Sequence, residues 1–333
     1  MDKTDNVNEC VNLGDVDGGF PEQQTLTLQR ALDLAVQHHS AGRLPEAEDI
    51  YRQILQADPN QPEALHLLGV IAHQVGKNDI AVDLIGKALA IKPDYDEAHN
   101  NLGLALQEQG NLNDAVASYR KALAINSDSA EAHNNLGNAL KELGRFDEAV
   151  ASCRKALAIK PDYAEAQNNL GLALQELGRL DEAVASYRKA LVIKPEFAEA
   201  HNNLGNTHKE LGRFGEAAAS YRKALAINSD YAEAHSNLGN ALNELGKLDE
   251  AVTSYHKALT IKPDYAEAHN NLGNALRDLG KPDDAVTSCR KAPDLKPDYA
   301  ATHYNLGNAL QDLGKLNEAV ASYHKALRLE EHT

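Results

Sequence analysis

Apolar and polar residues alternate along the chain with a helical period, in blocks that return every 34 residues. In residues 130–163, Ala132, Leu136 and Leu140 are four residues apart, which predicts one apolar face on a first helix. A second block, Ala149–Ile159, places its small and aliphatic residues at the same kind of spacing. Each block therefore predicts a pair of amphipathic helices.

The residues between these blocks predict where the helices begin and end. Gly144 is expected to end the first helix, because the residue after a helix commonly needs the left-handed conformation. Asp147 supplies negative charge to the start of the second helix, and Pro161 is expected to stop that helix. Asp162 and Glu165 form an Asp-x-x-Glu pattern that predicts a capping box for the following helix.

Phasing on this pattern divides the chain into nine units without an insertion. A two-helix unit cannot bury its apolar face alone, so neighbouring units are expected to stack into an all-α solenoid. Residues 1–27 are expected to form a disordered acidic tail. The predicted units are residues 28–61, 62–95, 96–129, 130–163, 164–197, 198–231, 232–265, 266–299 and 300–333.

The unit resembles the tetratricopeptide repeat (TPR), whose pattern places Leu-Gly, an aromatic residue, Ala and Pro at fixed offsets in 34 residues. The resemblance implies a right-handed superhelical solenoid of helix-turn-helix repeats and covers residues 28–333. Here His and Leu replace two of the family's aromatic residues, and Ser127 and Ser229 replace the proline in two units. The matching residues of one unit are His133, Leu136, Gly137, Leu140, Ala149, Cys153 and Pro161.

A stripe of asparagines lies on the polar side of each predicted first helix. Asparagine occupies position six of seven consecutive units and position nine of five units, away from the apolar face. In a curved two-helix solenoid, we expect the first helices to line the concave groove. The position-six residues, called the ladder asparagines, are Asn101, Asn135, Asn169, Asn203, Asn237, Asn271 and Asn305. The position-nine residues are Asn138, Asn206, Asn240, Asn274 and Asn308.

A row of side-chain amides can bind an extended peptide. Packed helices lie roughly 8–10 Å apart and an extended chain advances roughly 3.3 Å per residue, so one amide would meet about every third residue. A carboxamide offers one acceptor and two donors, which match a peptide's own N–H and C=O groups. The alternative is that these amides bridge adjacent helices or are inert copies of a duplicated unit.

The row also resembles the repeat region of O-linked N-acetylglucosamine transferase and its bacterial relatives. That resemblance implies that the ladder asparagines hold the backbone of substrate peptides. The asparagines beside them would assist, and these are Asn100, Asn134, Asn168, Asn202 and Asn270.

Charge narrows the class of partner. The chain has 33 basic and 49 acidic residues and a net charge of −16, which disfavours nucleic acid and anionic membrane. Glutamates at positions two and thirteen, such as Glu131 and Glu142, predict an acidic groove that suits a neutral or basic peptide. The N-terminal stretch does not resemble a signal peptide, and Cys153 and Cys289 are too far apart in the stack to pair, so a cytoplasmic location is expected.

Other signals favour packing over chemistry. Six histidines at position four, including His133 and His201, stand where the family has a packed aromatic residue. Stacked equivalents would lie roughly 10 Å apart, whereas zinc needs nitrogens about 2.0–2.1 Å from the ion. No nucleophile–base, phosphate-loop or metal-binding pattern occurs in the sequence. We therefore expect no enzyme activity, no metal and no cofactor.

Three departures from the repeat pattern lead to further structural predictions. Pro293 is expected to end its helix about a turn early, because proline removes a helix hydrogen bond. Leu67 and Val70 replace the polar stripe of the second unit and predict an apolar patch in the groove. Leu327 and Leu329 lie on a last helix that no repeat covers, which allows self-association.

These patterns predict a protein–protein interaction scaffold that binds extended peptides in the groove. One alternative is the substrate-recruiting region of a peptide glycosyltransferase resembling O-linked N-acetylglucosamine transferase, with the catalytic domain absent from this chain. Another is a structural protein that assembles end to end.

Overall fold

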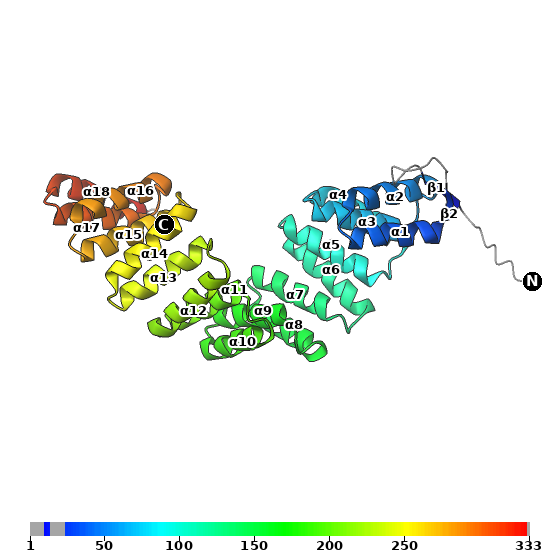
Figure 1. Cartoon of the computed structure of the whole chain (residues 1–333), viewed down its shortest axis with the longest axis horizontal. Coiled ribbons are helices and arrows are strands. Elements are labelled where there is room, and N and C mark those ends of the chain that lie inside the picture. Colours follow the sequence, from blue (N-terminus) through cyan, green and yellow to red (C-terminus); the bar gives the residue numbers. More distant parts are fainter. Residues whose placement is uncertain (1–9, 14–23, 332–333) are drawn as a thin grey trace, which may run out of the picture. The chain divides into compact units, whose positions relative to one another are not determined.

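In the computed structural model, the described residues are 10–13 and 24–331 (Figure 1). Within these ranges eighteen helices follow one another in contacting pairs, one pair in each predicted unit. The all-α prediction is therefore confirmed for residues 28–331. The chain divides into two compact units, residues 1–161 and 162–333.

The first compact unit contains four helix pairs. The two helices of a pair contact each other, and within this unit α2, α4 and α6 also contact the first helix of the next pair. The helices are α1 (Leu28–Ser40), α2 (Leu44–Ala57), α3 (Pro62–Gln74), α4 (Asn78–Ile91), α5 (Asp96–Glu108), α6 (Leu112–Ile125), α7 (Ala130–Glu142) and α8 (Phe146–Ile159).

The second compact unit contains five helix pairs with the same kind of contacts. Its helices are α9 (Ala164–Glu176), α10 (Leu180–Ile193), α11 (Ala198–Glu210), α12 (Phe214–Ile227), α13 (Ala232–Glu244), α14 (Leu248–Ile261), α15 (Ala266–Asp278), α16 (Pro282–Leu295), α17 (Ala300–Asp312) and α18 (Leu316–Glu330).

Glycine ends the first helix of each pair, as predicted. Gly144 has φ of +72°, the left-handed conformation that a side chain disfavours. Its amide donates to the carbonyl of Lys141 (2.9 Å), and the next amide, of Arg145, donates to Leu140 (2.8 Å). These are the two hydrogen bonds of a Schellman motif, which satisfies the last carbonyls of α7 and turns the chain into α8.

The predicted Asp-x-x-Glu capping box is wrong. The N-cap residue of α9 is Tyr163, and its side chain makes no capping hydrogen bond. Asp162 therefore lies one residue before the cap, where a carboxylate does not take the N-cap role. Only some first helices have a side-chain cap; Ser129 accepts from the amide of Ala132 (3.2 Å) at the start of α7.

Small residues let the two helices of a pair approach closely. The ring of Tyr187 in α10 lies directly over Gly171 in α9, so that a Cβ added at Gly171 would be 2.6 Å from Cε1 of that ring. Tyr187 is completely buried, together with its counterparts Tyr119 and Tyr221. The Leu-Gly of the second to ninth units therefore provides the space that the large residue of the second helix fills.

Proline does not shorten α16, and the prediction that it would is wrong. The helix continues through Pro293 to Leu295, and the amide of Lys296 still donates to the carbonyl of Ala292 (2.9 Å). Proline removes only its own hydrogen bond, to Cys289, within the last turn. Ala292 and Pro293 are both buried, so packing holds the turn in a helical conformation.

Two short strands lie in the segment that was expected to be a disordered tail. Strand β1 (Cys10–Leu13) pairs antiparallel with β2 (Gln24–Thr27), and Val11 is opposite Leu26. The strands differ from the prediction because valine, leucine and threonine there favour extended backbone. The rest of the predicted tail, residues 1–9 and 14–23, lies outside the described residues.

Consecutive first helices also contact each other, as α5 does with α7 and α15 with α17. Second helices of consecutive pairs are instead separated by grooves, such as the one between α6 and α8. The first helices are therefore the more closely packed row within each unit and form its inner side. In the described part of the chain, no helix combines the length and the apolar character that crossing a bilayer requires.

Candidate functional site

The ladder asparagines lie on the first helices, the row that packs closely within each unit. Asn101 and Asn135 belong to the first compact unit, and the other five belong to the second. Their side chains are half-buried, except that Asn203 is only 8% exposed. The structure therefore places them at the surface of the packed row, outside the apolar core.

Each of four ladder asparagines donates to the preceding repeat. Nδ2 of Asn135 donates to Oδ1 of Asn100 (3.2 Å), a residue at position five of the repeat before. The same hydrogen bond, always between residues 35 positions apart, joins Asn203 to Asn168 (3.1 Å), Asn237 to Asn202 (3.4 Å) and Asn305 to Asn270 (2.9 Å). The amides therefore bridge neighbouring helices, which was one of the alternatives left open by the sequence.

The position-five residues, called the bridge residues, are more deeply buried than the ladder. Asn168 is 2% exposed and Asn202 is 1% exposed. Nδ2 of Asn202 donates in turn to Oε1 of Glu233 in the next repeat, over 3.4 Å. A buried amide is costly unless its polar atoms are paired, so the bridge is part of what holds the first helices together.

The bridge leaves part of four ladder amides unused. A carboxamide has two N–H donors and an oxygen with two lone pairs, and the bridge takes one donor. Within residues 24–331, the side-chain oxygen of four ladder asparagines accepts no hydrogen bond: Asn135, Asn203, Asn237 and Asn305.

Asn271 is arranged differently because its bridge residue is a serine. Ser236 stands where three other repeats of the second unit have Asn168, Asn202 and Asn270. Nδ2 of Asn271 donates instead to Oδ1 of Asn240 (2.9 Å), and its own oxygen accepts from Asn270 (3.2 Å). This one ladder amide has both ends engaged.

The position-nine asparagines mainly accept from tyrosines of the second helices. The hydroxyl groups of Tyr221 and Tyr255 donate to Oδ1 of Asn206 (2.7 Å) and Asn240 (2.8 Å). Tyr323 likewise donates to Asn308 (2.8 Å). Burial raises the pKa of Tyr221 and Tyr255, so these hydroxyl groups keep their protons. Three of the five predicted residues are thus partners of the packed tyrosines.

The other two position-nine residues stand opposite cysteines. Asn138 donates to Oε1 of Glu142 (3.0 Å) in the repeat whose second helix carries Cys153. Asn274, in the repeat that carries Cys289, makes no hydrogen bond with the described residues. Its whole carboxamide is available to a ligand.

The row of bridge residues begins with a histidine. His66 occupies position five of the second repeat, and its Nε2 lies 2.8 Å from Nδ2 of Asn101. Nδ1 of His66 lies 2.9 Å from the hydroxyl group of Tyr95. Burial lowers the pKa of His66 from 6.5 to about 4, so the ring is neutral and Nε2 accepts from Asn101. The imidazole takes the place of the carboxamide oxygen.

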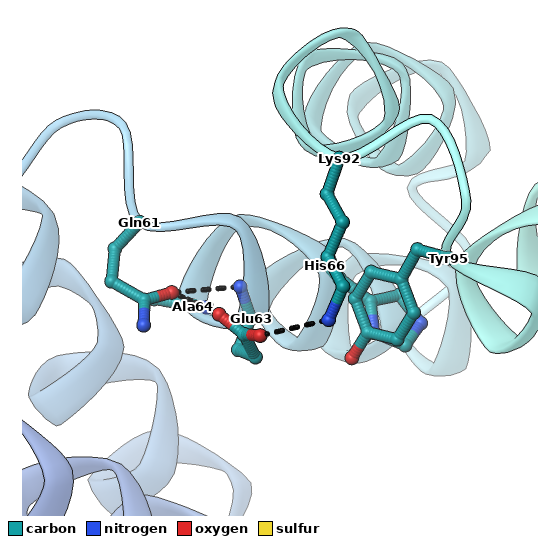
Figure 2. A network of polar contacts seen from close by, with 6 residues as sticks. All are labelled: Gln61, Glu63, Ala64, His66, Lys92 and Tyr95. Atoms are coloured by element: carbon teal, nitrogen blue, oxygen red, sulfur yellow. Dashed lines mark hydrogen bonds and ion pairs between the residues drawn. The ribbon is translucent and has the colours of Figure 1, made fainter.

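A polar network orders the residues around His66 (Figure 2). Gln61 caps α3 by accepting from the amides of Glu63 (2.7 Å) and Ala64 (3.1 Å). Lys92 pairs with Glu63 (3.2 Å) and lies over the ring of Tyr95, 4.4 Å from its centroid. The ring of Tyr95 covers His66, as the close-up shows.

A hollow of about 300 Å³ opens beside His66 on the inner side of the first unit. Leu67 and Val70 form its apolar wall, as the apolar patch of the second repeat predicted. Asn101 and the carboxylates of Glu97 and Glu131 form its polar wall. The hollow can hold a side chain that is apolar along its length and carries a donor or a positive charge at its tip.

Lysines partly neutralise the acidic row. Lys194 pairs with Glu165 (2.9 Å), and Lys296 pairs with Glu267 in the same way. In the third and sixth repeats Asn126 and Asn228 replace this lysine. The negative charge of the inner side is therefore lower than the number of glutamates predicts, and it is concentrated in the repeats that lack the lysine.

The histidines at position four are packed, as predicted. His133 and His201 are buried, and Nε2 of each donates to the carbonyl six residues earlier, Ser127 (3.2 Å) and Pro195 (3.1 Å). Cys153 and Cys289 are buried free thiols, and burial raises the pKa of Cys153 to about 12. Among the described residues, no group of His, Cys, Asp and Glu side chains is arranged to hold a metal ion.

The ladder asparagines were predicted from the sequence, but the hydrogen-bonding partners of these asparagines and of the position-nine asparagines were not. The role of His66 was not predicted, although its place at position five was a signal. The pairing of tyrosine with the position-nine asparagines was also missed, and it follows from the contact between the two helices of one repeat. The 35-residue offset of the bridge needs the relative rotation of successive helices, which the sequence does not contain.

Family models of the TPR repeat match residues 71–110, 108–144, 205–246, 239–280 and 273–314. Models described as tetratricopeptide repeat match residues 28–71, 128–196 and 300–332. The chain belongs to the tetratricopeptide repeat family. The more specific resemblance to the repeat region of O-linked N-acetylglucosamine transferase stays a prediction.

Two solved structures with TM-scores above 0.5 share the fold. The Cut9–Hcn1 hetero-tetramer of APC/C is 17% identical with a TM-score of 0.62, over 84% of this chain and 55% of that chain. PilF of Pseudomonas aeruginosa is 24% identical with a TM-score of 0.56, over 62% of this chain and 94% of that chain. YrrB, described as a TPR protein with an unusual peptide-binding site, is 25% identical with a TM-score of 0.48, over 56% and 96%. A comparison with curated proteins gives no match.

Proposed function

We propose that this TPR chain is a protein-interaction scaffold that binds extended peptide segments along the inner side of its first helices. The observation that supports this most is the pattern of unused hydrogen-bonding groups. Asn135, Asn203, Asn237 and Asn305 each leave a side-chain oxygen without a partner in residues 24–331, although the same amide is fixed by a bridge.

The bridge helps binding because it orients the amide in advance. A side chain that is already fixed loses little conformational freedom when a ligand arrives. Its oxygen accepts from a peptide N–H, and in Asn135, Asn203 and Asn305 the second N–H donates to a peptide C=O. Asn237 offers only its oxygen, because its Nδ2 also donates to Asn206 (3.1 Å). Repetition at every repeat suits a peptide in extended conformation, since the contacts are made with backbone groups that every residue has.

Charge and shape define the preferred peptide. The exposed carboxylates Glu97, Glu131 and Glu199 favour a neutral or basic segment over an acidic one. The hollow beside His66 suits a lysine or arginine side chain, whose aliphatic part would contact Leu67 and Val70. In this proposal the chain binds and presents polypeptide and carries out no chemistry itself.

Peptide-array binding with Asn274→Ala tests the proposal. Asn274 makes no hydrogen bond with the described residues, so removing its amide leaves the fold intact while removing contacts with a ligand. One lost hydrogen bond of about 1 kcal/mol should weaken bound peptides about fivefold. Thr253→Ala, on the exposed side of α14, is the matched control and should leave the array unchanged.

The triple variant Asn203→Ala, Asn237→Ala, Asn305→Ala should weaken binding much further, because three oxygens are lost at once. Thermal melts would show how much of the chain remains folded. If Asn274→Ala binds like the parent chain, and the folded triple variant keeps both affinity and selectivity, the asparagines do not hold the peptide.

A further inference from the structure

Grooves between consecutive second helices line the side of the chain opposite to the asparagines. They lie between α6 and α8, α10 and α12, α12 and α14, and α14 and α16, with a first helix as the floor. The groove between α10 and α12, called the α10–α12 groove, measures about 830 Å³. Its three equivalents measure about 650, 610 and 500 Å³.

Two residues of this groove differ from the residues at the same positions of other repeats. Val192 stands where the equivalent grooves have Ala124, Ala226 or Thr260, and 82% of its surface is exposed. His208 stands on the floor where the other repeats from the third onward have leucine. Leu204 and Ile227 complete an apolar trough around these two residues.

His208 is buried without a hydrogen bond. It is 3% exposed, and neither ring nitrogen makes a hydrogen bond with the described residues. Burial lowers the pKa of His208. Nε2 lies 3.3 Å from Oε2 of Glu216, near enough for an ion pair when the ring is protonated. A buried, unpaired polar group on the floor of a groove is costly unless something else pairs with it.

The position of Glu216 leaves an arginine unpaired. In two of the equivalent grooves an arginine of one second helix pairs with a glutamate of the next: Arg120 with Glu148 (2.9 Å) and Arg222 with Glu250 (2.8 Å). Arg290 of α16 pairs in the same way with Glu318 of α18 (2.6 Å). Glu216 is the corresponding glutamate for Arg188, but it lies beside His208 instead. Arg188 therefore has no ion pair within residues 24–331.

We propose that the α10–α12 groove is a second binding site, which takes a peptide segment with an aliphatic side chain next to a carboxylate. The aliphatic side chain would lie in the trough formed by Val192, Leu204 and Ile227. The carboxylate pairs with Arg188 and with Lys223, which is exposed on the facing helix. Arginine binds a carboxylate well because its planar fork matches the two oxygens.

The occupant is a peptide because the trough is open along its length. Arg188, Val192 and Lys223 are all exposed at its rim, so one side of the ligand stays in water. An extended acidic segment meets this condition, and its charge complements the unpaired arginine. The site would thus select acidic peptides, whereas the inner side favours neutral or basic ones. The two proposals are independent.

Methyl NMR spectra of the full chain test the site directly. The probe is an acetylated nonapeptide of alternating leucine and glutamate, and its counterpart with glutamine in place of glutamate is the matched control. We expect shifts confined to the methyl signals of Leu191, Val192, Leu204 and Ile227, with none at Leu136 and Ile159 of the α6–α8 groove. The glutamine peptide should bind about fivefold more weakly, as expected for the loss of one charged contact of about 1 kcal/mol.

One pair of substitutions should remove the site from the α10–α12 groove, and another should create it in the α6–α8 groove. Val192→Ala with His208→Leu gives this groove the residues of the α6–α8 and α12–α14 grooves and should lower the affinity about tenfold or more, as for a loss of about 1.4 kcal/mol. Ala124→Val with Leu140→His places the two departures in the α6–α8 groove and should create shifts there. The first double variant is expected to fold at least as well as the parent chain, because it removes a buried unpaired histidine.

Three outcomes would overturn the proposal. One is that the two grooves respond equally to the peptide, and another is that Val192→Ala with His208→Leu leaves the affinity unchanged. A third is that octanoate shifts these methyl signals and the peptide does not, which would assign the groove to a small aliphatic acid. Concentration-dependent sedimentation without peptide, abolished by the same double variant, would assign it to a second copy of the chain and also contradict the proposal.

Discussion

The side-chain amide of Asn203 donates a hydrogen bond to Oδ1 of Asn168, 35 residues earlier, over 3.1 Å. Asn168 is 2% exposed, so water cannot replace this donor. The oxygen of Asn203 itself accepts nothing from residues 24–331. One side chain therefore joins two repeats and still presents an acceptor on the inner side.

This hydrogen bond predicts that replacing Asn203 destabilises the chain more than replacing Asn274. Asn203→Ala leaves the buried oxygen of Asn168 unpaired and should lower the free energy of unfolding by about 1–3 kcal/mol. Asn274→Ala removes no internal hydrogen bond and should change it by less than about 0.5 kcal/mol. Urea unfolding followed by circular dichroism measures both. Equal effects of the two substitutions would show that the bridge contributes nothing to stability.

Two glycines inside helices should respond in opposite directions. Gly171→Ala places a Cβ 2.6 Å from the buried ring of Tyr187 and should destabilise the chain by about 1–3 kcal/mol. Gly86→Ala in α4 meets nothing within 4 Å and should stabilise it by about 1 kcal/mol, because alanine favours helix. Thermal unfolding of the two variants provides the comparison. A neutral Gly171→Ala would mean that α9 and α10 can separate without cost.

Pro293→Leu should stabilise the chain. The substitution restores the residue that α8 has at the equivalent position, Leu157, and gives back the helix hydrogen bond to Cys289. Proline in a helix costs about 3 kcal/mol, and its place in the last turn reduces this to an expected gain of about 1–2 kcal/mol. Hydrogen exchange of the amides of α16 would locate the gain. Unchanged protection there would show that packing already compensates fully for the proline.

Stability should fall as the pH drops from about 6.5 to 4. The pKa of His66 is about 4 in the folded chain and 6.5 as the ordinary value, so the unfolded chain binds the proton first. The contribution of the neutral ring is complete above pH 6.5 and is lost as the pH falls toward 4, up to about 3 kcal/mol. Burial lowers the pKa of His133, His201, His208, His235 and His269 in the same direction.

Unfolding of the parent chain and of His66→Asn at pH 7.5, 5.5 and 4.5 tests this contribution. Asparagine is the residue that most other repeats have at this position, so the bridge to Asn101 should be kept. The pH dependence of the variant should be shallower by up to one proton. Identical pH dependence would show that His66 does not titrate differently in the folded and unfolded chains.

Helix ends, buried positions and helix faces could be predicted from the sequence, because each depends on the residues of a single repeat. Gly144 has the left-handed conformation that its place after a helix required, and His133 is buried as its position in the apolar pattern indicated. The place of Asn203 on the inner row also followed from the helical period. Each of these needs only the spacing of residues along one helix.

The remaining features depend on the packing geometry between helices, or on the balance between two opposing energetic effects. Pro293 stays helical because burial outweighs the lost hydrogen bond, and the sequence does not show that balance. The bridge from Asn203 to Asn168 depends on the rotation between successive helices. Glu216 lies beside His208 because a leucine is missing from the floor of its groove, and no motif indicates this.

The bridge has a direction, and that direction bears on how such a chain can grow. The third and sixth repeats, which have asparagine at positions five and six, each offer an acceptor to the next repeat and a donor to the one before it. A whole 34-residue repeat can therefore be inserted or deleted between such repeats, and each buried amide still has a hydrogen-bond partner. Ser236 interrupts this rule, so the junction after it is the place where an exchange of blocks would require new partners.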